Sequence, residues 1–458
     1  MKLFYDVHDK PTFGKTIVFA IQQLLAIMAA TLVVPVITNG NAGLVGADAM
    51  QPAAALFGAG AGTIVYLLFT KFRSPVFLGS SFAFLGSMAA AFAGAGTVVA
   101  LGYLGLIIGA VLAGLVYVII AIAVKLAGVN WINKLMPAVV IGPTVAIIGL
   151  SLAGNAVGDL QKAPAGGHPL VAVLCGLVTL FTVILCSNFG KKTVKLIPFI
   201  IGILAGYVVA SIFTVIGNVA GIDALKVVDY SSFKALVADG FTLNTILTFP
   251  KFTFLKAFGA FGELSGSYIA SVAMAYVPVA FVVFAEHLAD HKNISSIIEK
   301  DLLTDPGLSR TLLGDGVGSM AGALFGGCPN TTYGESVACV AITGNASVVT
   351  IFTAAIGAIL ISFIAPFVAF VNSIPSCVMG GVCMALYGFI AVSGLKMFKD
   401  IDLGENKNLF VVSTILISGI GGLTLTFGKI TLTSIAVSLI LGIIVNAMIT
   451  GIEKRINK

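Results

Sequence analysis

Charged side chains are scarce in this chain of 458 residues, since only 10% of them are Asp, Glu, Lys or Arg. A water-soluble domain carries about 25% charged residues, so this chain has too few to cover a soluble surface. Hydrophobic residues make up 58% of the sequence, and apolar runs of about 20 residues recur along its whole length. Runs of that length cross a bilayer as helices, so the sequence predicts a multi-pass membrane protein.

The sequence also lacks the patterns of several other protein classes. Its six cysteines show neither a metal-ligand spacing nor the arrangement of a disulfide-rich secreted domain. No constellation of a nucleophile with a base indicates an enzyme. The basic residues are scattered over short loops, which excludes a nucleic-acid surface. We therefore expect a protein that is not an enzyme, with no cofactor, no metal and no nucleic-acid partner.

Fourteen apolar segments can be placed along the chain. The third and tenth are poor helices, because both are rich in Ser, Thr and Gly near the middle of the run. The segments are approximately 16–38, 52–70, 75–92, 100–124, 137–154, 169–187, 196–216, 270–292, 312–327, 329–343, 347–370, 375–392, 409–427 and 430–450.

The charges of the loops support this number of segments. The first residues, MKLFYDVHDKPTFGKT, include acidic residues and no cleavage site, so they are expected to form a cytoplasmic tail and not a signal peptide. With that end inside, cytoplasmic stretches contain 19 of the Lys and Arg residues and the opposite side contains 6. This asymmetry follows the positive-inside rule, and an even number of crossings places both termini in the cytoplasm.

Two polar segments, GSSFAF (79–84) and PNTTYGE (329–335), occupy matching places in the two halves of the chain. Each belongs to the third segment of its half. Seven segments per half is an odd number, so the second half must be inverted in the membrane, an arrangement typical of secondary transporters with a site at the midplane. The predicted fold is an all-α polytopic membrane protein with two inverted repeats of seven segments. The repeats span residues 1–220 and 266–458, joined by an extracellular connector at 221–265.

Four acidic residues lie within the predicted segments, namely Glu286, Asp290, Asp315 and Glu335. A charged group at membrane depth costs at least about 2.5 kcal/mol, so such residues usually face a cavity. The alternative for Glu286 and Glu335 is a carboxylate bonded to neighbouring backbone. Asp290 shares a helix face with Glu286, although the Lys at position 292 leaves open that it lies at the cytoplasmic mouth. Asp315 is expected at the start of its helix, near the cytoplasm.

The candidate site suits a planar heterocycle that carries both N–H and C=O groups. Ionised Glu286 and Glu335 are hydrogen-bond acceptors, which require N–H donors. Unwound segments offer backbone N–H groups that bind carbonyl oxygens. Phe82 and Tyr333, on the two broken segments, offer flat apolar faces. Glu286, with Asp290 one helical turn away, is the candidate proton-coupling group. His287 beside it is either packed or part of the coupling.

Five motifs stand out along the chain: LGSSFAF (78–84), FAEH (284–287), KDLLTDPGLSRTLLGDG (300–316), PNTTYGE (329–335) and PSCVMGGVCMALYGFIAVSG (375–394). Together they resemble the nucleobase–ascorbate transporter family, and within it the bacterial uracil permeases. The resemblance spans nearly the whole chain and keeps the order and spacing of the motifs. It implies import of uracil by proton symport in the bacterial inner membrane.

The resemblance also implies an architecture and a pocket. Segments 1–4 and 8–11 would form a core domain, segments 5–7 and 12–14 a gate domain, and a homodimer would form through the gate domains. The third and tenth segments would be short strands followed by helices. In the pocket, Glu286 and Glu335 would bind the pyrimidine and Phe82 would stack on it. Backbone contacts would come from Tyr333 and Gly334, and Ala30 and Tyr387 would line the pocket.

The chain departs from the family pattern in three places. The first helix reads Gln22-Gln23 where the family usually has Gln-His. In the eighth segment Asp290 replaces the second His of Glu-His-x-x-His. The signature after the tenth segment has Ser336 where Asn is usual and ends in Gly344 in place of Arg. These departures affect the coupling groups and the fine selectivity more than the substrate class.

Two other functions remain open at this point. A purine permease of the same family, for xanthine, urate or hypoxanthine, usually has Gln where Glu335 stands. An anion exchanger of the same architecture should present helix N-termini or a basic residue without paired acids. The two carboxylates favour a pyrimidine over both.

Overall fold

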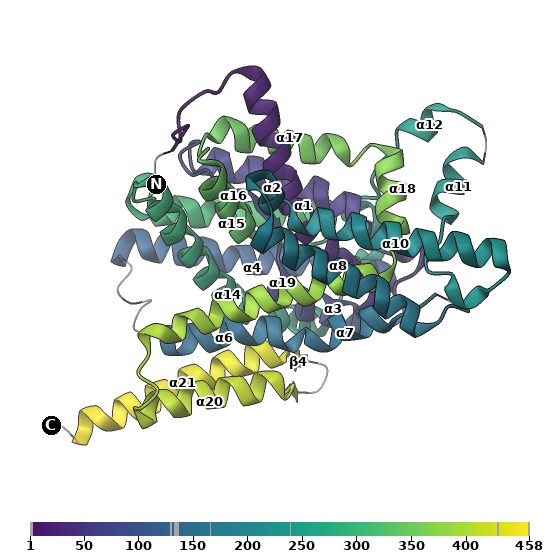
Figure 1. Ribbon diagram of the computed structural model, residues 1–458. Coiled ribbons are helices and arrows are strands. Elements are labelled where there is room, and N and C mark those ends of the chain that lie inside the picture. The colour runs from purple at the N-terminus through teal and green to yellow at the C-terminus, as the bar shows by residue number, and fades with distance from the viewer. Residues whose placement is uncertain are drawn as a thin grey trace.

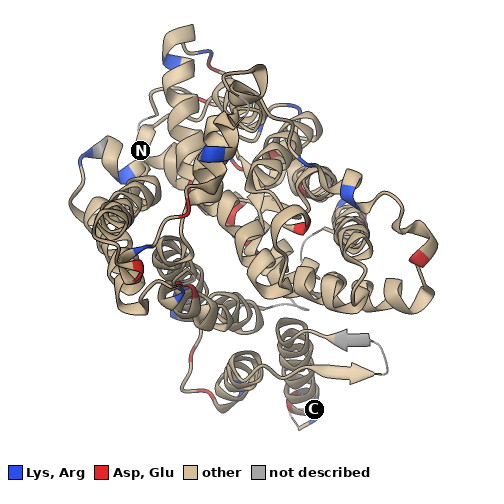
Figure 2. Ribbon diagram, turned by 90° about the vertical axis from the view of Figure 1, so that its right-hand side faces the viewer, with Lys and Arg blue, Asp and Glu red and all other residues tan. Residues whose placement is uncertain are grey.

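The computed structural model describes residues 3–128, 131, 137–164, 166–238, 240–427 and 430–456. Its long helices lie side by side and run in roughly the same direction (Figure 1). Viewed nearly along these helices, most of the ribbon carries no charge (Figure 2). The protein is therefore a bundle of apolar helices, as the composition predicts for a multi-pass membrane protein.

Nine helical stretches of the described residues are long and apolar enough to cross a membrane. They contain α1 (Phe13–Ala42), α2 (Pro52–Phe69), α4 (Val99–Ala127), α6 (Ala138–Ser151) with α7 (Ala153–Gln161), α8 (Pro169–Phe189), α10 (Pro198–Ala220), α14 (Gly266–Ile298), α19 (Ser376–Lys396) and α21 (Ser434–Ile456). The remaining predicted segments contain helices that are shorter or less apolar. These are α3 (Leu85–Ala95), α15 (Leu308–Gly326), α16 (Gly334–Thr343), α17 (Val348–Ile361) and α20 (Asn406–Ile420). The number of fourteen crossings stays a prediction.

Short elements connect these helices. The strands are β1 (Leu78–Ser80), β2 (Asn330–Thr332), β3 (Leu425–Phe427) and β4 (Ile430–Leu432). Short helices are α9 (Lys192–Leu196), α11 (Ser231–Val237), α12 (Leu243–Ile246), α13 (Thr253–Ala257) and α18 (Ala365–Ser373). Single 3-10 turns are η1 (Gly46–Asp48), η2 (Phe82–Phe84), η3 (Asp223–Leu225), η4 (Ala260–Glu263) and η6 (Met397–Asp400). The third and tenth segments each contain a strand followed by a helix, which confirms that expectation.

The helices pack in two groups. In the first group, α2 contacts α1, α15 and α17, and α4 contacts α3, α14 and α15. In the second group, α19 contacts α6, α7 and α8, and α20 contacts α6 and α21. Contacts of α1 with α10 and of α14 with α6 and α21 join the two groups. A boundary between two packed groups is a place where a cavity can open without breaking either one.

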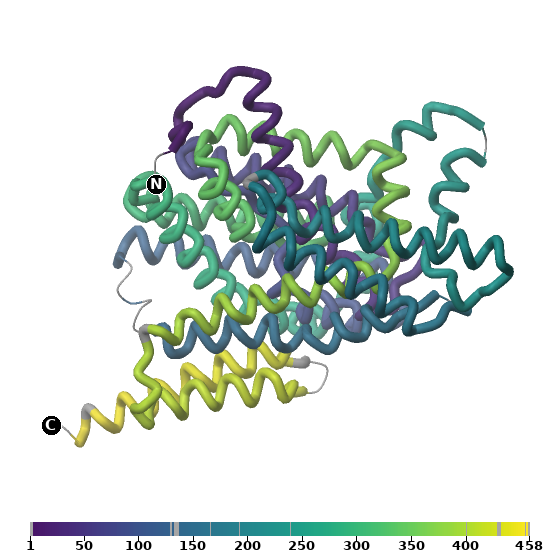
Figure 3. The backbone as a smooth tube through the Cα atoms, viewed as in Figure 1, coloured from purple at the N-terminus to yellow at the C-terminus, as the bar shows by residue number. Residues whose placement is uncertain are grey.

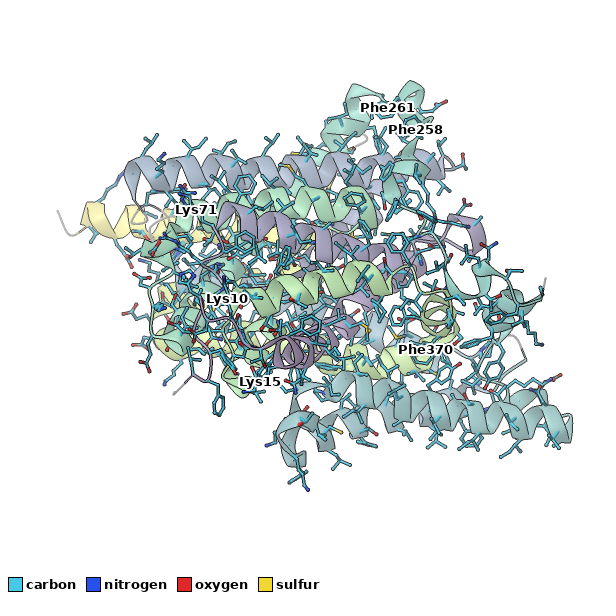
Figure 4. The ribbon with its side chains drawn as sticks, turned by 90° about the horizontal axis from the view of Figure 1, so that it is seen from above. Lys10, Lys15, Lys71, Phe258, Phe261 and Phe370 are labelled. Carbon is cyan, nitrogen blue, oxygen red and sulfur yellow. The ribbon has the colours of Figure 1, made fainter. Side chains whose placement is uncertain are left out.

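Both termini lie at the same end of the bundle (Figure 3). Seen from above, Lys10, Lys15 and Lys71 lie toward one end of the helices, and Phe258 and Phe261 lie toward the other (Figure 4). This arrangement agrees with the predicted separation of cytoplasmic lysines from the connector. Four of the basic residues in that prediction, Lys2, Lys134, Lys429 and Lys458, lie outside the described residues.

The connector between α10 and α14 is anchored to the first group of helices through Lys256 of α13. Its ammonium donates to the carbonyl oxygens of Ala47 at 3.0 Å and Ala49 at 2.6 Å, and to Tyr103 Oη at 3.1 Å. Burial, with the charge of Lys251 nearby, lowers the pKa of Lys256 to about 8. The ammonium thus has an acceptor for each of its three N–H groups, which fixes the connector over the loop that precedes α2.

Glycines allow α2 and α15 to approach backbone to backbone. A Cβ at Gly58 would lie 2.5 Å from the carbonyl oxygen of Gly322, and one at Gly62 would lie 2.6 Å from that of Gly318. Asn330 of β2 donates to the Gly58 carbonyl oxygen at 3.0 Å. Small residues at helix contacts are the usual means of close packing in lipid. The bond from Asn330 to Gly58 also holds β2 against α2.

Gly62→Ala should destabilise the protein, because the added methyl group would overlap the backbone of α15. Overpacking of this kind costs about 1–3 kcal/mol, which should lower the thermal unfolding midpoint of detergent-solubilised protein. The matched control is Gly388→Ala in α19, where a Cβ meets nothing within 4 Å. Equal midpoints for the two variants would contradict the close packing of α2 on α15.

Candidate functional site

The strands β1 and β2 pair inside the protein, far apart in sequence. They are antiparallel, with Gly79 opposite Thr331, and all of their residues are buried. Tyr333 Oη donates to the carbonyl oxygen of Ser80 at 2.6 Å. The Tyr333 ring occupies the space where a side chain at Gly79 would lie. Glycine is therefore required for this close approach.

A short helix follows each strand. After β1 the chain enters η2 and α3, and after β2 it enters α16, whose N-cap is Tyr333. The first N–H groups of a helix have no partner within the helix and carry a partial positive charge. Two helix N-termini thus begin at the strand pair and provide hydrogen-bond donors there.

Three carboxylates lie beside these helix starts. Glu335 is in the first turn of α16, where a negative charge is stabilised by the helix dipole. Glu286 and Asp290 are one turn apart on α14 and share a face. Thr332 of β2 donates to Asp290 Oδ2 at 2.8 Å. The strand pair and α14 therefore bring the three acidic groups together.

A cavity of about 440 Å³ begins at these carboxylates. A smaller one of about 60 Å³ continues from it to Phe82 and Tyr333. Both are lined by Val145, Glu286, Gly334, Glu335, Leu386 and Ile390. The larger cavity also reaches Lys195 in α9 and Met397 after α19. Lys195 and Met397 lie in connections between the long helices, so the cavity extends toward that end of the bundle.

The side of the cavity opposite the carboxylates is apolar. Val145 and Ile148 come from α6, and Leu386 and Ile390 from α19. Phe82 completes the smaller cavity, so the site lies between the two groups of helices. Carboxylate acceptors, backbone donors and an aromatic ring surround one volume. This combination suits a planar polar molecule, and the carboxylates would repel an anion.

The predicted substrate-binding residues fall into two sets. Five of the seven line the smaller cavity, and those five are Glu286, Glu335, Phe82, Tyr333 and Gly334. Ala30 is buried in α1 and is not among the residues that line either cavity. Tyr387 is also outside both linings, but its ring contacts Phe82 edge-on, with centroids 5.9 Å apart. Tyr387 thus packs against Phe82 from outside the two cavity linings.

The predicted proton-coupling residues do not share one surface. Glu286 and Asp290 line the larger cavity. His287 is fully buried on another face of α14, where its Nδ1 lies 2.7 Å from Asp315 Oδ2 and its Nε2 lies 3.0 Å from Thr311 Oγ1. The expectation that Asp315 lies at the start of its helix is wrong. The helix begins at Leu308, and Asp315 is buried well inside it.

Two contacts of the site were not predicted from the sequence. One is the bond from Thr332 to Asp290. The other joins Gln23 of α1 to Ser336 Oγ, which also accepts from the backbone N–H of Phe77 at 3.0 Å. Gln23 and Ser336 are two of the departures from the family pattern. The sequence therefore marked both positions as unusual, but it gave no indication that Gln23 and Ser336 are in contact.

Comparison with known proteins agrees with this site. Residues 14–428 match the model of the Permease family. The chain is 38% identical to a uracil permease of Bacillus caldolyticus over 97% of this chain and 94% of that protein. It is 33% identical to a uracil permease of Escherichia coli K12 over 95% of this chain and 92% of that protein. These relatives are named as transporters and not as enzymes.

The fold is similar to that of the transmembrane domain of a cyanobacterial bicarbonate transporter, BicA. The two structures superpose with a TM-score of 0.57 over 96% of this chain and 100% of that one, at 14% sequence identity. At this identity the likeness concerns the fold alone. The helical bundle thus has the fold of a membrane transporter.

A cysteine at Ala338 should react with a thiol reagent that enters the cavity from the side of Lys195, because Ala338 lines the larger cavity. The control is a cysteine at Val340, two residues along α16 and buried. Both variants are made in a background without the native cysteines, and labelling is followed by mass spectrometry. Equal labelling of the two positions would contradict the open cavity.

Proposed function

Because the chain belongs to the Permease family, together with relatives that are named uracil permeases, we propose that it imports a nucleobase, with uracil as the substrate. The observation that supports this most strongly is the cavity that Glu286 and Glu335 line together with Phe82 and the residues at the start of α16. Two carboxylates would repel an anion from this site. The protein is a membrane transporter, and we assign it to the bacterial cytoplasmic membrane.

In the proposed complex, uracil lies in the smaller cavity and extends into the larger one. Glu286 and Glu335 accept hydrogen bonds from ring N–H groups. The backbone at Tyr333 and Gly334, where α16 begins, donates to a ring carbonyl oxygen. Phe82 offers its face to the ring, and stacking on an aromatic side chain contributes about 1–3 kcal/mol per base.

The proposed transport cycle uses the two groups of helices as separate bodies. The first group corresponds to segments 1–4 and 8–11, the core domain, and the second to segments 5–7 and 12–14, the gate domain. The two inverted repeats of seven segments supply both domains. Movement of one domain against the other would expose the site alternately on the two sides. With both termini in the cytoplasm, the opening near Lys195 faces inward, and gate domains of two copies form a homodimer.

The proposed energy source is the proton gradient. The cavity contains three carboxyl groups and, among its described lining residues, one basic side chain, Lys195. Uptake of a proton by Glu286 removes one negative charge from these three carboxyl groups. Substrate binding can then follow this protonation. Asp290, on the same face, would pass the proton toward the cytoplasm. His287, which is hydrogen-bonded to Asp315, would respond to this proton transfer through α14.

Uptake of labelled uracil into proteoliposomes tests the proposed substrate. Unlabelled uracil should compete strongly, thymine less strongly, and xanthine and hypoxanthine weakly. Bicarbonate and sulfate should not compete. Strong competition by the purines would show a purine permease. Uptake of bicarbonate or sulfate by a protein that takes up no uracil would overturn the proposal.

Glu335→Ala should weaken uracil binding, because a ring N–H loses its charged acceptor. Loss of such a hydrogen bond costs about 1.5–3 kcal/mol, which corresponds to roughly a 10- to 150-fold rise in Kd. Equilibrium binding to the purified protein measures this rise. Glu263→Ala, a carboxylate outside the cavity in η4, serves as the control. Unchanged binding in folded Glu335→Ala protein would remove Glu335 from the site.

Glu286→Gln should separate binding from coupling, because glutamine resembles the protonated carboxyl but cannot release a proton. The variant should still bind uracil and exchange it across the membrane. It should lose accumulation of uracil driven by an imposed pH gradient. Asp290→Asn should slow uptake and change its pH dependence with nearly normal binding. If a sodium gradient alone drives accumulation in the wild type, the proton mechanism is wrong.

A further inference from the structure

A chain of buried polar side chains holds α14 on the face next to its carboxylates. His291 of α14 is fully buried, and its Nε2 is hydrogen-bonded to Tyr66 Oη of α2 at 2.7 Å. Tyr66 Oη is also bonded to Ser74 Oγ at 2.6 Å, in the connection that leads to β1. His291 Nδ1 donates to the carbonyl oxygen of His287 at 2.8 Å. All of these groups lie outside the cavity lining.

Adjacent residues of α14 are therefore held from two directions. Asp290 accepts from Thr332 of β2 at 2.8 Å on the cavity side. His291, the next residue, is held by Tyr66 on the side of α2. Successive residues of a helix point about 100° apart, so these two bonds together fix the rotation of α14 about its axis. Glu286 lies one turn from Asp290, and its position in the cavity depends on that rotation.

We propose that Tyr66 and His291 are positioning residues for the substrate site, and that their hydrogen bond sets where Glu286 lies. Neither side chain contacts the substrate. Ser74 extends the same network to the connection before β1. The network therefore fixes the position of η2, which carries Phe82, relative to α14, which carries Glu286. This inference rests on the proposed role of Glu286 in binding a nucleobase.

The test is Tyr66→Phe, which removes the hydroxyl and keeps the ring. Misplacement of one substrate-binding group should raise the KM for uracil roughly 5- to 20-fold, with the maximal rate per folded protein nearly unchanged. The matched control is Tyr207→Phe in the second group of helices. There the lost hydroxyl is also bonded to a serine, Ser373, at 2.8 Å. Tyr207→Phe should keep the wild-type KM.

A double variant distinguishes positioning from general destabilisation. In a Glu286→Ala background, Tyr66→Phe should add little to the KM or to the Kd for uracil, because the contact that it misplaces is already lost. In a Glu335→Gln background it should add its full effect. The same added effect in both backgrounds, or an unchanged KM in Tyr66→Phe alone, would overturn the proposal. If Tyr66→Phe does not fold, Ser74→Ala should change the KM in the same direction, and a wild-type KM would again overturn it.

A readout without substrate separates this inference from the proposed function. Ala289 lines the larger cavity next to Asp290, so a cysteine there reports the rotation of α14. In the background without native cysteines, Tyr66→Phe should change its rate of thiol labelling by about threefold or more, since that residue turns with the helix. An unchanged rate would contradict the positioning role. If the wild-type protein takes up no nucleobase and Tyr66→Phe still changes the labelling rate, only the proposed substrate is overturned.

Discussion

The backbone at the centre of a membrane protein must be hydrogen-bonded within the protein, because lipid offers it no partners. Two segments of this chain are not helical inside the bundle, and the backbone of each is hydrogen-bonded to the other as β1 and β2. The pairing requires close approach, which Gly79 permits, and support from α2, which Asn330 provides. Irregular backbone inside a bilayer persists only where it is buried or lines a cavity. Here both conditions hold.

The site follows from this constraint. Once the two segments pair as strands, the helices after them begin inside the protein, beside the strand pair. Carboxylates are stabilised beside such helix starts, which explains how Glu335 can lie within a membrane protein. Glu286 and Asp290 reach the same place because α14 runs beside α16 and β2. The second group of helices then closes the site with apolar side chains from α6 and α19.

The sequence was sufficient to predict the features that depend on composition and on residue type. Hydrophobic runs indicated the membrane helices, and the Ser-, Thr- and Gly-rich runs at 79–84 and 329–335 indicated the two broken segments. The isolated acids Glu286 and Glu335 indicated the polar site, and the structure brings them into one cavity. These predictions succeed because lipid imposes a large cost on any polar group without a role.

Features that depend on the relative rotation and depth of helices could not be predicted in this way. The bond of Thr332 to Asp290 joins residues 42 positions apart, and their contact depends on how β2 lies against α14. Asp315 was expected near a helix start because the predicted segment began at residue 312, whereas α15 begins about one turn earlier, at Leu308. Ala30 was expected to line the pocket from the family resemblance, but it is buried in α1 and outside both cavity linings. A resemblance indicates the segment, and packing decides which side of it faces the site.

Transport as proposed requires a nucleobase to bind between Phe82 and the carboxylates Glu286 and Glu335. Crystals of the protein grown with 5-bromouracil, with diffraction recorded at the bromine absorption edge, test it most directly. An anomalous peak is expected inside the cavity shared by α14, α16 and η2. A peak only in the separate groove of about 500 Å³ beside Tyr5, Lys15 and Phe19, or no peak at saturating ligand, would contradict it.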